Sequence, residues 1–333
     1  WLGKKKGKEA YIVPTVVGDH IEYSIGHDPK TAPTAGTIAG GKGRCLACDA
    51  LVENAYIRRQ ATSKGLGQQL IAIVAEGDRQ RIYLEPTRTQ GDAAVGIERP
   101  ADVPTQMVPT PNHDVDRLPM YGMPTWGDAF TTRQLVALTT FSDLVGEARE
   151  RVLRDALSTG MAEGERIEEG GSGAAAYADA VATYLGFVVS RLTDYSSSIN
   201  TWASNPQMEI LRNVFARQAL PMSWDFAEGN PFADSSGSLA IMIRAVSLAV
   251  ERTPARGPSV AEQADAATRD YSGVVISTDP PYYDNIGYSD LSDFFYVWLR
   301  RSLKSIHPRL LSTVLVPKEE ELVANPYRHG GRD

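Results

Sequence analysis

The sequence has only two cysteines, and it has no apolar run that approaches the roughly 20 residues of a membrane-spanning helix. It also does not open with a secretory signal. Two cysteines cannot form the disulfide framework of a small secreted domain, so a reducing cytoplasm is the expected compartment. These scarcities argue against membrane-embedded and disulfide-rich extracellular proteins.

The sequence also has no excess of basic residues, since its net charge is −7. This balance gives no general support to nucleic-acid binding, although local patches decide such binding and can occur on an acidic protein. The run Lys4-Lys5-Lys6-Gly7-Lys8 is one local cluster. Such runs are usually solvated termini, and contact with nucleic acid is the alternative interpretation.

What is present is an ordinary globular composition, with 42% hydrophobic and 23% charged residues. The 333 residues suffice for two or three domains with a substantial core. The sequence predicts a hairpin over 11–25 with Gly18-Asp19 at its turn, a helix at Leu66–Ala75 and a strand at Arg81–Leu84. Residues 99–127 are proline-rich and are typical of a long connector.

From Thr131 onward the apolar period becomes helical, with Thr131 or Thr132 as the N-cap. The glycine-rich segment 158–173 then predicts a flexible break. Further helices are expected near 174–194, 207–218 and 237–251, before a polar link over 252–270.

Cys45-Leu46-Ala47-Cys48 has the spacing of one half of a zinc ribbon, because a closed structural zinc site requires four ligands. The second cysteine pair is absent, and His20 and His27 are the only nearby substitutes. Two unmetallated thiols remain the alternative.

Near the carboxyl end, the β-branched run of residues 271–278 predicts a strand that stops at Asp279-Pro280-Pro281-Tyr282. Each proline fixes its own φ, removes a backbone donor and pushes the preceding residue toward an extended conformation. The expected result is a stiff turn at a strand end, where ligands bind in open α/β sheets. A surface turn is the plainer interpretation.

Asp279-Pro280-Pro281-Tyr282 resembles the DPPY motif of methyltransferases that act on the exocyclic amino group of adenine. In that chemistry the Asp279 carboxylate and the Pro280 carbonyl accept hydrogen bonds from an amine that is a poor nucleophile, and they offset its growing positive charge. The Tyr282 ring stacks on a base that has left the duplex. Similar turns serve enzymes that methylate protein glutamine or RNA bases.

Beside this motif, Tyr283, Asn285 and Tyr288 are candidates for substrate contacts, with local packing as the alternative. Ser289 and Asp290 are expected to cap a helix with an apolar face. In the loop that follows, Arg328 and His329 are candidates for contact with phosphate.

The resemblance extends over nearly the whole chain, to large bacterial and archaeal adenine-specific DNA methylases with a zinc-ribbon insert. It is most specific at 224–237 and at 279–298. It implies catalytic roles for Asp279, Pro280, Pro281 and Tyr282, and a zinc role for Cys45 and Cys48. It also implies DNA as the partner and S-adenosylmethionine as the methyl donor of the whole protein.

The sequence departs from the family in two ways. It has no Phe/Pro-x-Gly-x-Gly loop after a strand, since neither 40–43 nor 170–173 has that context, and it lacks the first CxxC. The chain starts at Trp1, and too few residues follow Tyr282 for the remaining strands of a methyltransferase sheet. We therefore expect an excised fragment, with the base-facing half of a site and without the donor-facing half.

The expected fold is α/β, a partial Rossmann-like methyltransferase core with a helical insert and a small N-terminal zinc-ribbon-like subdomain. We expect a β-rich zinc-ribbon-like half at 1–62 and a helix, strand and connector at 63–130. A helical region at 131–270 and a methyltransferase core segment at 271–333 complete the division. The alternative function is a module that binds nucleic acid or a partner in a phage-defence or restriction-modification-like system, without catalysis of its own.

Overall fold

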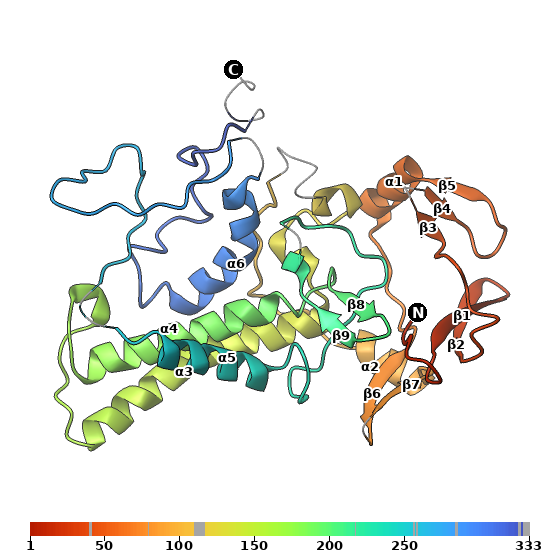
Figure 1. Cartoon of the computed structure of the whole chain (residues 1–333), viewed down its shortest axis with the longest axis horizontal. Helices are drawn as coiled ribbons and strands as arrows, with labels where there is room; N and C mark the ends of the chain where they lie inside the picture. Colours follow the sequence, from red (N-terminus) through yellow and green to blue (C-terminus); the bar gives the residue numbers. More distant parts are fainter. Residues whose placement is uncertain are drawn as a thin grey trace.

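Short antiparallel hairpins form one end of the molecule and four long helices form the other (Figure 1). The computed structural model describes residues 1–39, 42–78, 80–109, 117–216, 218–255, 257, 259–283, 286–325 and 328. Every strand pair among these residues is antiparallel, in sheets of two or three strands. The α/β expectation therefore holds as a mixture of helices and strands, and the described residues contain no parallel pair.

The first hairpin confirms the sequence prediction. Strands β1 (Tyr11–Val17) and β2 (His20–Gly26) pair in register from Tyr11 with Gly26 to Val17 with His20. Gly18 has a φ of 62° at the turn, a conformation that glycine adopts without steric cost. A three-stranded sheet follows, made of β3 (Ile38–Ala39), β4 (Lys42–Arg44) and β5 (Leu51–Glu53).

The helix predicted at Leu66–Ala75 is wrong. The helix is α1 (Asn54–Lys64), which ends before Gly65, and β6 (Ile73–Gly77) pairs with β7 (Gln80–Leu84). Strand β6 starts with β-branched residues and pairs with β7, the strand that the sequence predicts correctly. This pairing outweighs the preference for a helix that the apolar spacing indicates. Helix α2 (Arg88–Val95) and the short turns η1 (Leu118–Tyr121) and η2 (Trp126–Ala129) lead to the helical part.

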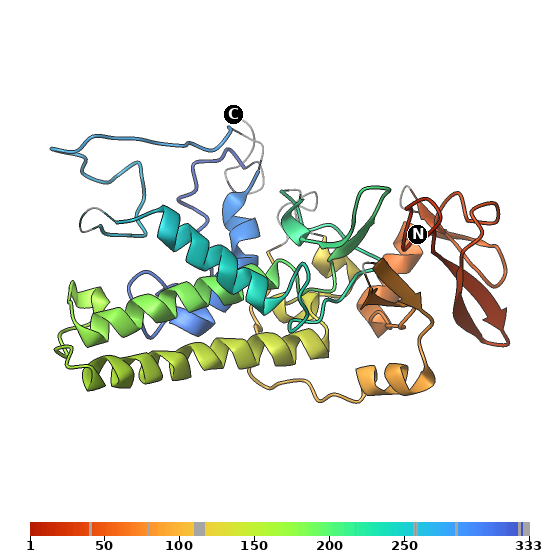
Figure 2. The same ribbon diagram turned by 60° about the horizontal axis from the view of Figure 1, so that its bottom comes forward.

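The long helices α3 (Thr132–Ser158) and α4 (Ala174–Thr193) pack side by side, and α5 (Leu239–Arg252) crosses α4 (Figure 2). All three confirm the helical periods read from the sequence. Helix α6 (Tyr288–Leu303) packs on α3 and α4 and supplies Phe294 and Trp298, both fully buried. One hydrophobic core joins these helices to the two short turns before α3.

A buried charge cluster ties the far end of α3 to α4. Asp179 is fully buried and accepts hydrogen bonds from Arg149 Nε at 2.6 Å and from Arg166 Nε at 3.0 Å. The backbone N–H of Ile167, in the turn η3 (Ile167–Glu169), donates to the same carboxylate. These hydrogen bonds lower the pKa of Asp179 against the opposing effect of burial. The connection predicted to be a flexible break is thus held by paired charges.

The helix predicted near 207–218 is also wrong. Strands β8 (Thr201–Ser204) and β9 (Glu209–Arg212) form a hairpin, followed by the turn η4 (Val214–Ala216). The hairpin docks on the amino-terminal segment, since the indole of Trp202 donates to the Leu2 carbonyl at 2.7 Å. A contact between residues 200 positions apart cannot be predicted from the local spacing of apolar residues. In the described residues, no helix combines the length and the apolar character needed to cross a bilayer.

The N-cap of α3 generates a prediction. Thr131 is 1% exposed, its hydroxyl accepts from the Gln134 N–H at 3.2 Å, and Gln134 Oε1 accepts from the Thr131 N–H at 2.8 Å. We expect Thr131→Ala to lower the free energy of unfolding by about 1–2 kcal/mol, because it removes a buried cap. Urea denaturation measures this change.

Thr87→Ala is the matched control, since Thr87 makes the same capping box with Gln90 in α2, a helix without buried residues. Its effect on global unfolding should be close to zero. Equal losses in the two variants would contradict the structural importance assigned to the α3 cap.

Candidate functional site

The chain between α5 and α6 carries the candidate motif, and its conformation differs from the prediction. Residues 271–278 were expected to form a strand, yet the described residues from 253 to 287 contain neither helix nor strand. The side chains of Val274, Val275 and Ile276 are 60%, 99% and 56% exposed. A β-branched run becomes a strand only where another strand accepts its backbone hydrogen bonds, and the described part of the chain places none beside it.

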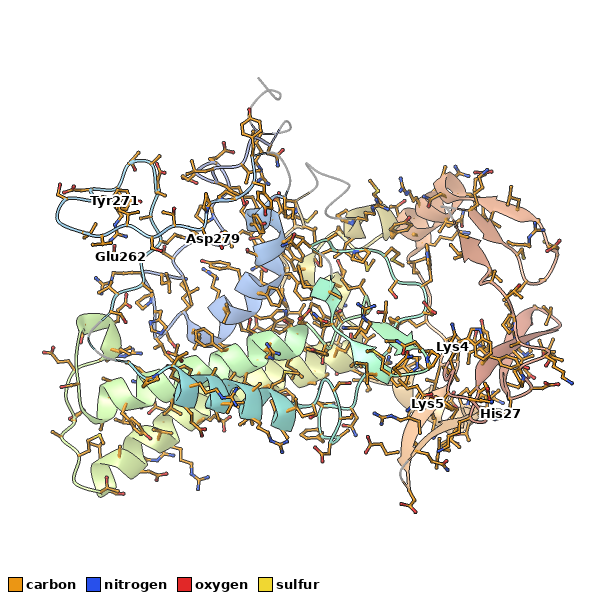
Figure 3. The ribbon with its side chains drawn as sticks, in the orientation of Figure 1. Lys4, Lys5, His27, Glu262, Tyr271 and Asp279 are labelled. Atoms are coloured by element: carbon orange, nitrogen blue, oxygen red, sulfur yellow. The ribbon has the colours of Figure 1, made fainter. Side chains whose placement is uncertain are left out.

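The motif residues lie on this extended coil, which projects from the helical part of the molecule (Figures 2 and 3). Asp279 and Pro280 are exposed, Pro281 is half-buried, and the Tyr282 ring is 73% exposed. None of these residues lines the cleft between α6 and residues 102–106 or the hollow beside β3 and β4. The turn is therefore accessible, and the described residues do not enclose it.

Of the second group of candidates, Tyr283 is 67% exposed and Tyr288 is 36% exposed at the start of α6. Asn285 lies outside the described residues. The Tyr283 carbonyl accepts a hydrogen bond from the Ala324 N–H at 2.7 Å. This contact attaches the carboxyl side of the motif to the segment that follows α6.

The cap predicted at Ser289 and Asp290 is wrong, because α6 begins after Gly287 and has no side-chain cap. Charged side chains hold its first two turns instead. Asp293 is fully buried, and its carboxylate forms an ion pair with Lys318 at 2.7 Å and accepts the Val316 N–H at 2.8 Å. Ser289 donates to Glu321 from both its N–H, at 2.8 Å, and its hydroxyl, at 2.6 Å. We call these residues, together with Asp290 and Arg328, the α6 clamp.

Arg328 belongs to the α6 clamp and is not available to phosphate. Its guanidinium pairs with Asp290, which is 3% exposed, and lies 3.8 Å from Glu321. Only 9% of the Arg328 side chain is exposed. The phosphate contact predicted for this residue is therefore wrong, and the other candidate in that loop, His329, lies outside the described residues.

A sequence signal for the α6 clamp exists in retrospect. Asp290 and Asp293 share a face with the apolar Phe294 and Val297, whereas acidic residues normally occupy the solvated face of a helix. Burial raises the pKa of Asp293, and the neighbouring Lys318 opposes that rise. A buried carboxylate of this kind requires a cation.

The cysteine pair lies in the turn between β4 and β5. The Asp49 N–H donates to the Cys45 carbonyl at 2.9 Å, and Asp49 has a φ of 60°. Backbone N–H groups of Cys48 and, to a smaller extent, Ala47 donate to the Cys45 sulfur and lower the pKa of that thiol. The turn thus favours a thiolate, the form that binds a metal.

The two histidines do not complete a metal site. His20 pairs with Asp19 and Glu22 in the first hairpin, and His27 Nδ1 lies 2.8 Å from the Glu9 carbonyl oxygen. The described residues contain no group of three or more histidine, cysteine or acidic side chains that could hold one ion. The described structure therefore does not bring His20 or His27, the nearby substitutes named from the sequence, together with the cysteine pair in such a group.

The glycine-rich segment 170–173 does not offer an open cradle for S-adenosylmethionine. The glycine-rich segment before α4 is packed against itself, since a Cβ at Gly171 would lie 2.1 Å from the Glu165 carbonyl oxygen. A Cβ at Gly173 would lie 2.5 Å from the Ala162 carbonyl oxygen. These glycines permit close contact between backbone segments, so they do not form an open cradle for a ligand.

The α6 clamp gives a test by pH. We expect Lys318→Met to lower the free energy of unfolding by about 3–5 kcal/mol at neutral pH, because it leaves the Asp293 charge buried and unpaired. The native pKa of Asp293 lies above its unfolded value of 3.8, so its ionisation costs stability as the pH rises. The loss in Lys318→Met should therefore shrink toward acid pH, where Asp293 is protonated.

Denaturation at several pH values measures this difference, with the exposed Lys30→Met as the charge-matched control. Adding Asp293→Asn to Lys318→Met should restore most of the lost stability at neutral pH. A pH-independent loss would show that Lys318 does not compensate Asp293.

Comparison with known proteins returned no match, either to a family model, to a curated protein or to a solved structure.

Proposed function

We propose that Asp279, Pro280, Pro281 and Tyr282 form the base-binding turn of an S-adenosylmethionine-dependent adenine N6-methyltransferase that acts on DNA. The supporting observation is the combination of an exposed turn with a firmly held neighbour. The Tyr282 ring is 73% exposed, while the next residue, Tyr283, is hydrogen-bonded to the segment that the α6 clamp holds. A turn that must stack on a base requires both accessibility and a fixed position.

The roles of these residues follow from the chemistry of an aromatic amine, whose lone pair is delocalised into the ring. The Asp279 carboxylate and the Pro280 carbonyl accept hydrogen bonds from the adenine amino group and stabilise the positive charge that develops on it. Tyr282 stacks on the extruded base, a contact worth about 1–3 kcal/mol. Tyr283, Asn285 and Tyr288 are the proposed further contacts with the substrate.

The fold proposed for this region is Rossmann-like, with residues 271–278 as a strand of a parallel sheet. Three exposed β-branched side chains in a row support this assignment. Burying each of them would gain about 1.5–3 kcal/mol, so pairing with a sheet is favourable. The other strands and the donor-binding loop are not among the described residues, so donor binding is assigned to another part of the protein.

For the cysteine pair we propose a structural zinc site in which Cys45 and Cys48 supply two of four ligands. The hydrogen bonds that lower the pKa of Cys45 support this role. The remaining ligands have to come from residues other than those described.

Asp279→Ala tests the catalytic assignment in the natural protein, assayed by transfer of labelled methyl groups to adenine-containing DNA. We expect at least about a 100-fold loss of methyl transfer, because an acceptor for the developing charge is removed. DNA affinity should stay nearly unchanged. The control is Asp270→Ala, an exposed aspartate of the same coil whose hydrogen bonds go to Ser272.

Methyl transfer that persists in Asp279→Ala would refute the catalytic role. Equal losses in the two variants would show that the coil, and not the Asp279 carboxylate, matters for activity.

A second prediction concerns the methyl donor. Titration calorimetry of the 333-residue chain with S-adenosylmethionine should give no saturable heat, because its glycine-rich segment is filled by its own backbone. The same chain should transfer no methyl groups. Tight donor binding would contradict the assignment of the donor site to other residues.

A non-catalytic function is the second candidate, as a module that binds nucleic acid or a protein of a defence system. The observation that favours it is that no residue of the motif lines the cleft between α6 and residues 102–106 or the hollow beside β3 and β4. The two candidates separate in the natural protein. A binding module retains DNA affinity and shows no methyl transfer before any substitution is made.

A further inference from the structure

The amino-terminal lysine run forms an ordered hairpin rather than a solvated tail. The backbone groups of Gly3 and Ala10 pair in antiparallel fashion, with an N–H to carbonyl distance of 3.0 Å in each direction. Between them, the Lys8 N–H donates to the Lys5 carbonyl at 2.9 Å, and Gly7 has a φ of 78°. These features define a tight turn in which the lysines have fixed positions along the backbone. We call the segment from Gly3 to Ala10 the lysine hairpin.

Two contacts fix the lysine hairpin to the rest of the chain. At its base, the Leu2 carbonyl accepts a hydrogen bond from the Trp202 indole at 2.7 Å. On its inner side, the Lys5 ammonium lies 3.4 Å from a carboxylate oxygen of Glu209, whose side chain is 4% exposed. A buried carboxylate requires a cation, so Lys5 has a structural role.

The other three lysines of the hairpin have no such role. Lys4, Lys6 and Lys8 are exposed, and none of them forms an ion pair with a described residue. The Lys4 ammonium lies 5.5 Å from the Trp1 ring centroid, which orients it. Lys6 and Lys8 lie in the turn, beyond the paired residues, so they neither protect a strand edge nor stabilise the end of a helix. Their charge is therefore available to a ligand.

The local charge of this segment is opposite to that of the whole chain. Residues 1–11 hold four lysines and one glutamate, although the net charge of the protein is −7. Ammonium groups gathered in one turn repel one another, and an anionic ligand relieves that repulsion. None of these lysines lines the cleft between α6 and residues 102–106 or the hollow beside β3 and β4. A projecting group of cations fits an extended polyanion better than a small anion, which needs enclosing walls.

We propose that the lysine hairpin binds the phosphodiester backbone of nucleic acid. Lysine ammonium groups contact backbone phosphates as point charges without reading the bases, and release of counterions provides the affinity. Lys4 and Lys5 lie at the other end of the molecule from Asp279, so the hairpin holds the nucleic acid away from the base that reacts (Figure 3). Nucleic acid as the partner follows from the charge, and only its being DNA rests on the proposed function.

Fluorescence anisotropy of a labelled DNA duplex with the 333-residue chain, at several salt concentrations, tests this surface. We expect Lys6→Gln with Lys8→Gln to weaken binding at low salt by about tenfold and to reduce the salt slope by about 2. The matched control is Lys64→Gln with Lys304→Gln, which removes two exposed lysines that also lack an ion pair with a described residue. Both double variants should keep the parent's unfolding midpoint, because all four side chains are exposed.

Gly7→Ala distinguishes a fixed hairpin from a flexible run of charge. An alanine adopts the φ of 78° at this position only with strain, and its Cβ would have no neighbour within 4 Å. The substitution loosens the turn without changing its charge, so we expect about a threefold loss of duplex affinity through lost preorganisation, with an unchanged salt slope. The matched control is Gly18→Ala, where φ is 62° and the space is equally open, in the turn between β1 and β2.

The outcomes that would overturn the proposal are distinct. Equal affinities and salt slopes in the two lysine double variants would overturn the site. Equal affinities in Gly7→Ala and in the parent would overturn the need for a fixed hairpin. Binding to vesicles of phosphatidylcholine and phosphatidylserine in equal parts that requires Lys6 and Lys8, without binding to nucleic acid, would replace nucleic acid by a membrane surface.

Titration with an RNA duplex identifies the nucleic acid. Tighter binding of the DNA duplex, with the loss confined to the Lys6 and Lys8 variant, supports DNA as the partner. Tighter binding of the RNA duplex with the same dependence supports the lysine hairpin and overturns DNA.

Methyl transfer by the natural protein separates this inference from the proposed function. Loss of duplex affinity in the Lys6 and Lys8 variant of a protein that transfers no methyl groups supports the lysine hairpin and refutes the enzymatic proposal. Unchanged duplex affinity in the same variant of an active methyltransferase refutes the lysine hairpin and leaves the enzymatic proposal intact.

Discussion

Burial of α6 is the constraint on which the helical part of this structure depends. Its aromatic residues Phe294 and Trp298 are fully buried, and the Phe130 ring lies 5.5 Å from the first and 5.3 Å from the second. The same burial takes Asp290 and Asp293 out of water. Two carboxylates in that position require cations, so the segment that carries Lys318 and Arg328 must fold back over the helix start. The buried position of α6 thus explains both the packing of its aromatic residues and the ion pairs of the α6 clamp.

The segment immediately before this helix exposes its apolar side chains. Val274, Val275 and Ile276 are as apolar as the core residues, yet they are among the most exposed apolar side chains of the chain. Their backbone groups also have no strand partner among the described residues. The residue types of this segment favour a strand, whereas its conformation is an unpaired coil. Such a conflict between local sequence and structure is typical of interaction or functional sites. The DPPY turn is therefore attached to a fixed element on one side and to an unpaired strand-forming run on the other.

Sequence reasoning succeeded where structure follows from local pattern. The helices beginning after Thr131, Gly173 and Ser238 and the hairpin with Gly18 at its turn follow from apolar period and turn chemistry. It failed where a distant partner decides, as in the hairpin that Trp202 fixes to Leu2 and the strand β6. In the candidate site, the motif residues could be read from the sequence. For the α6 clamp only the carboxylates have a sequence signal, because Lys318 and Arg328 lie far along the chain from the carboxylates that they neutralise.

The distribution of charge decides which basic residues can accompany the motif. Lys4 and Lys5 lie at the opposite end of the molecule from Asp279 (Figure 3). Lys5 is also paired with the buried Glu209 at 3.4 Å, and the Lys4 ammonium lies 5.5 Å from the Trp1 ring centroid. The basic run that is most conspicuous in the sequence is therefore partly used by the fold and is remote from the turn.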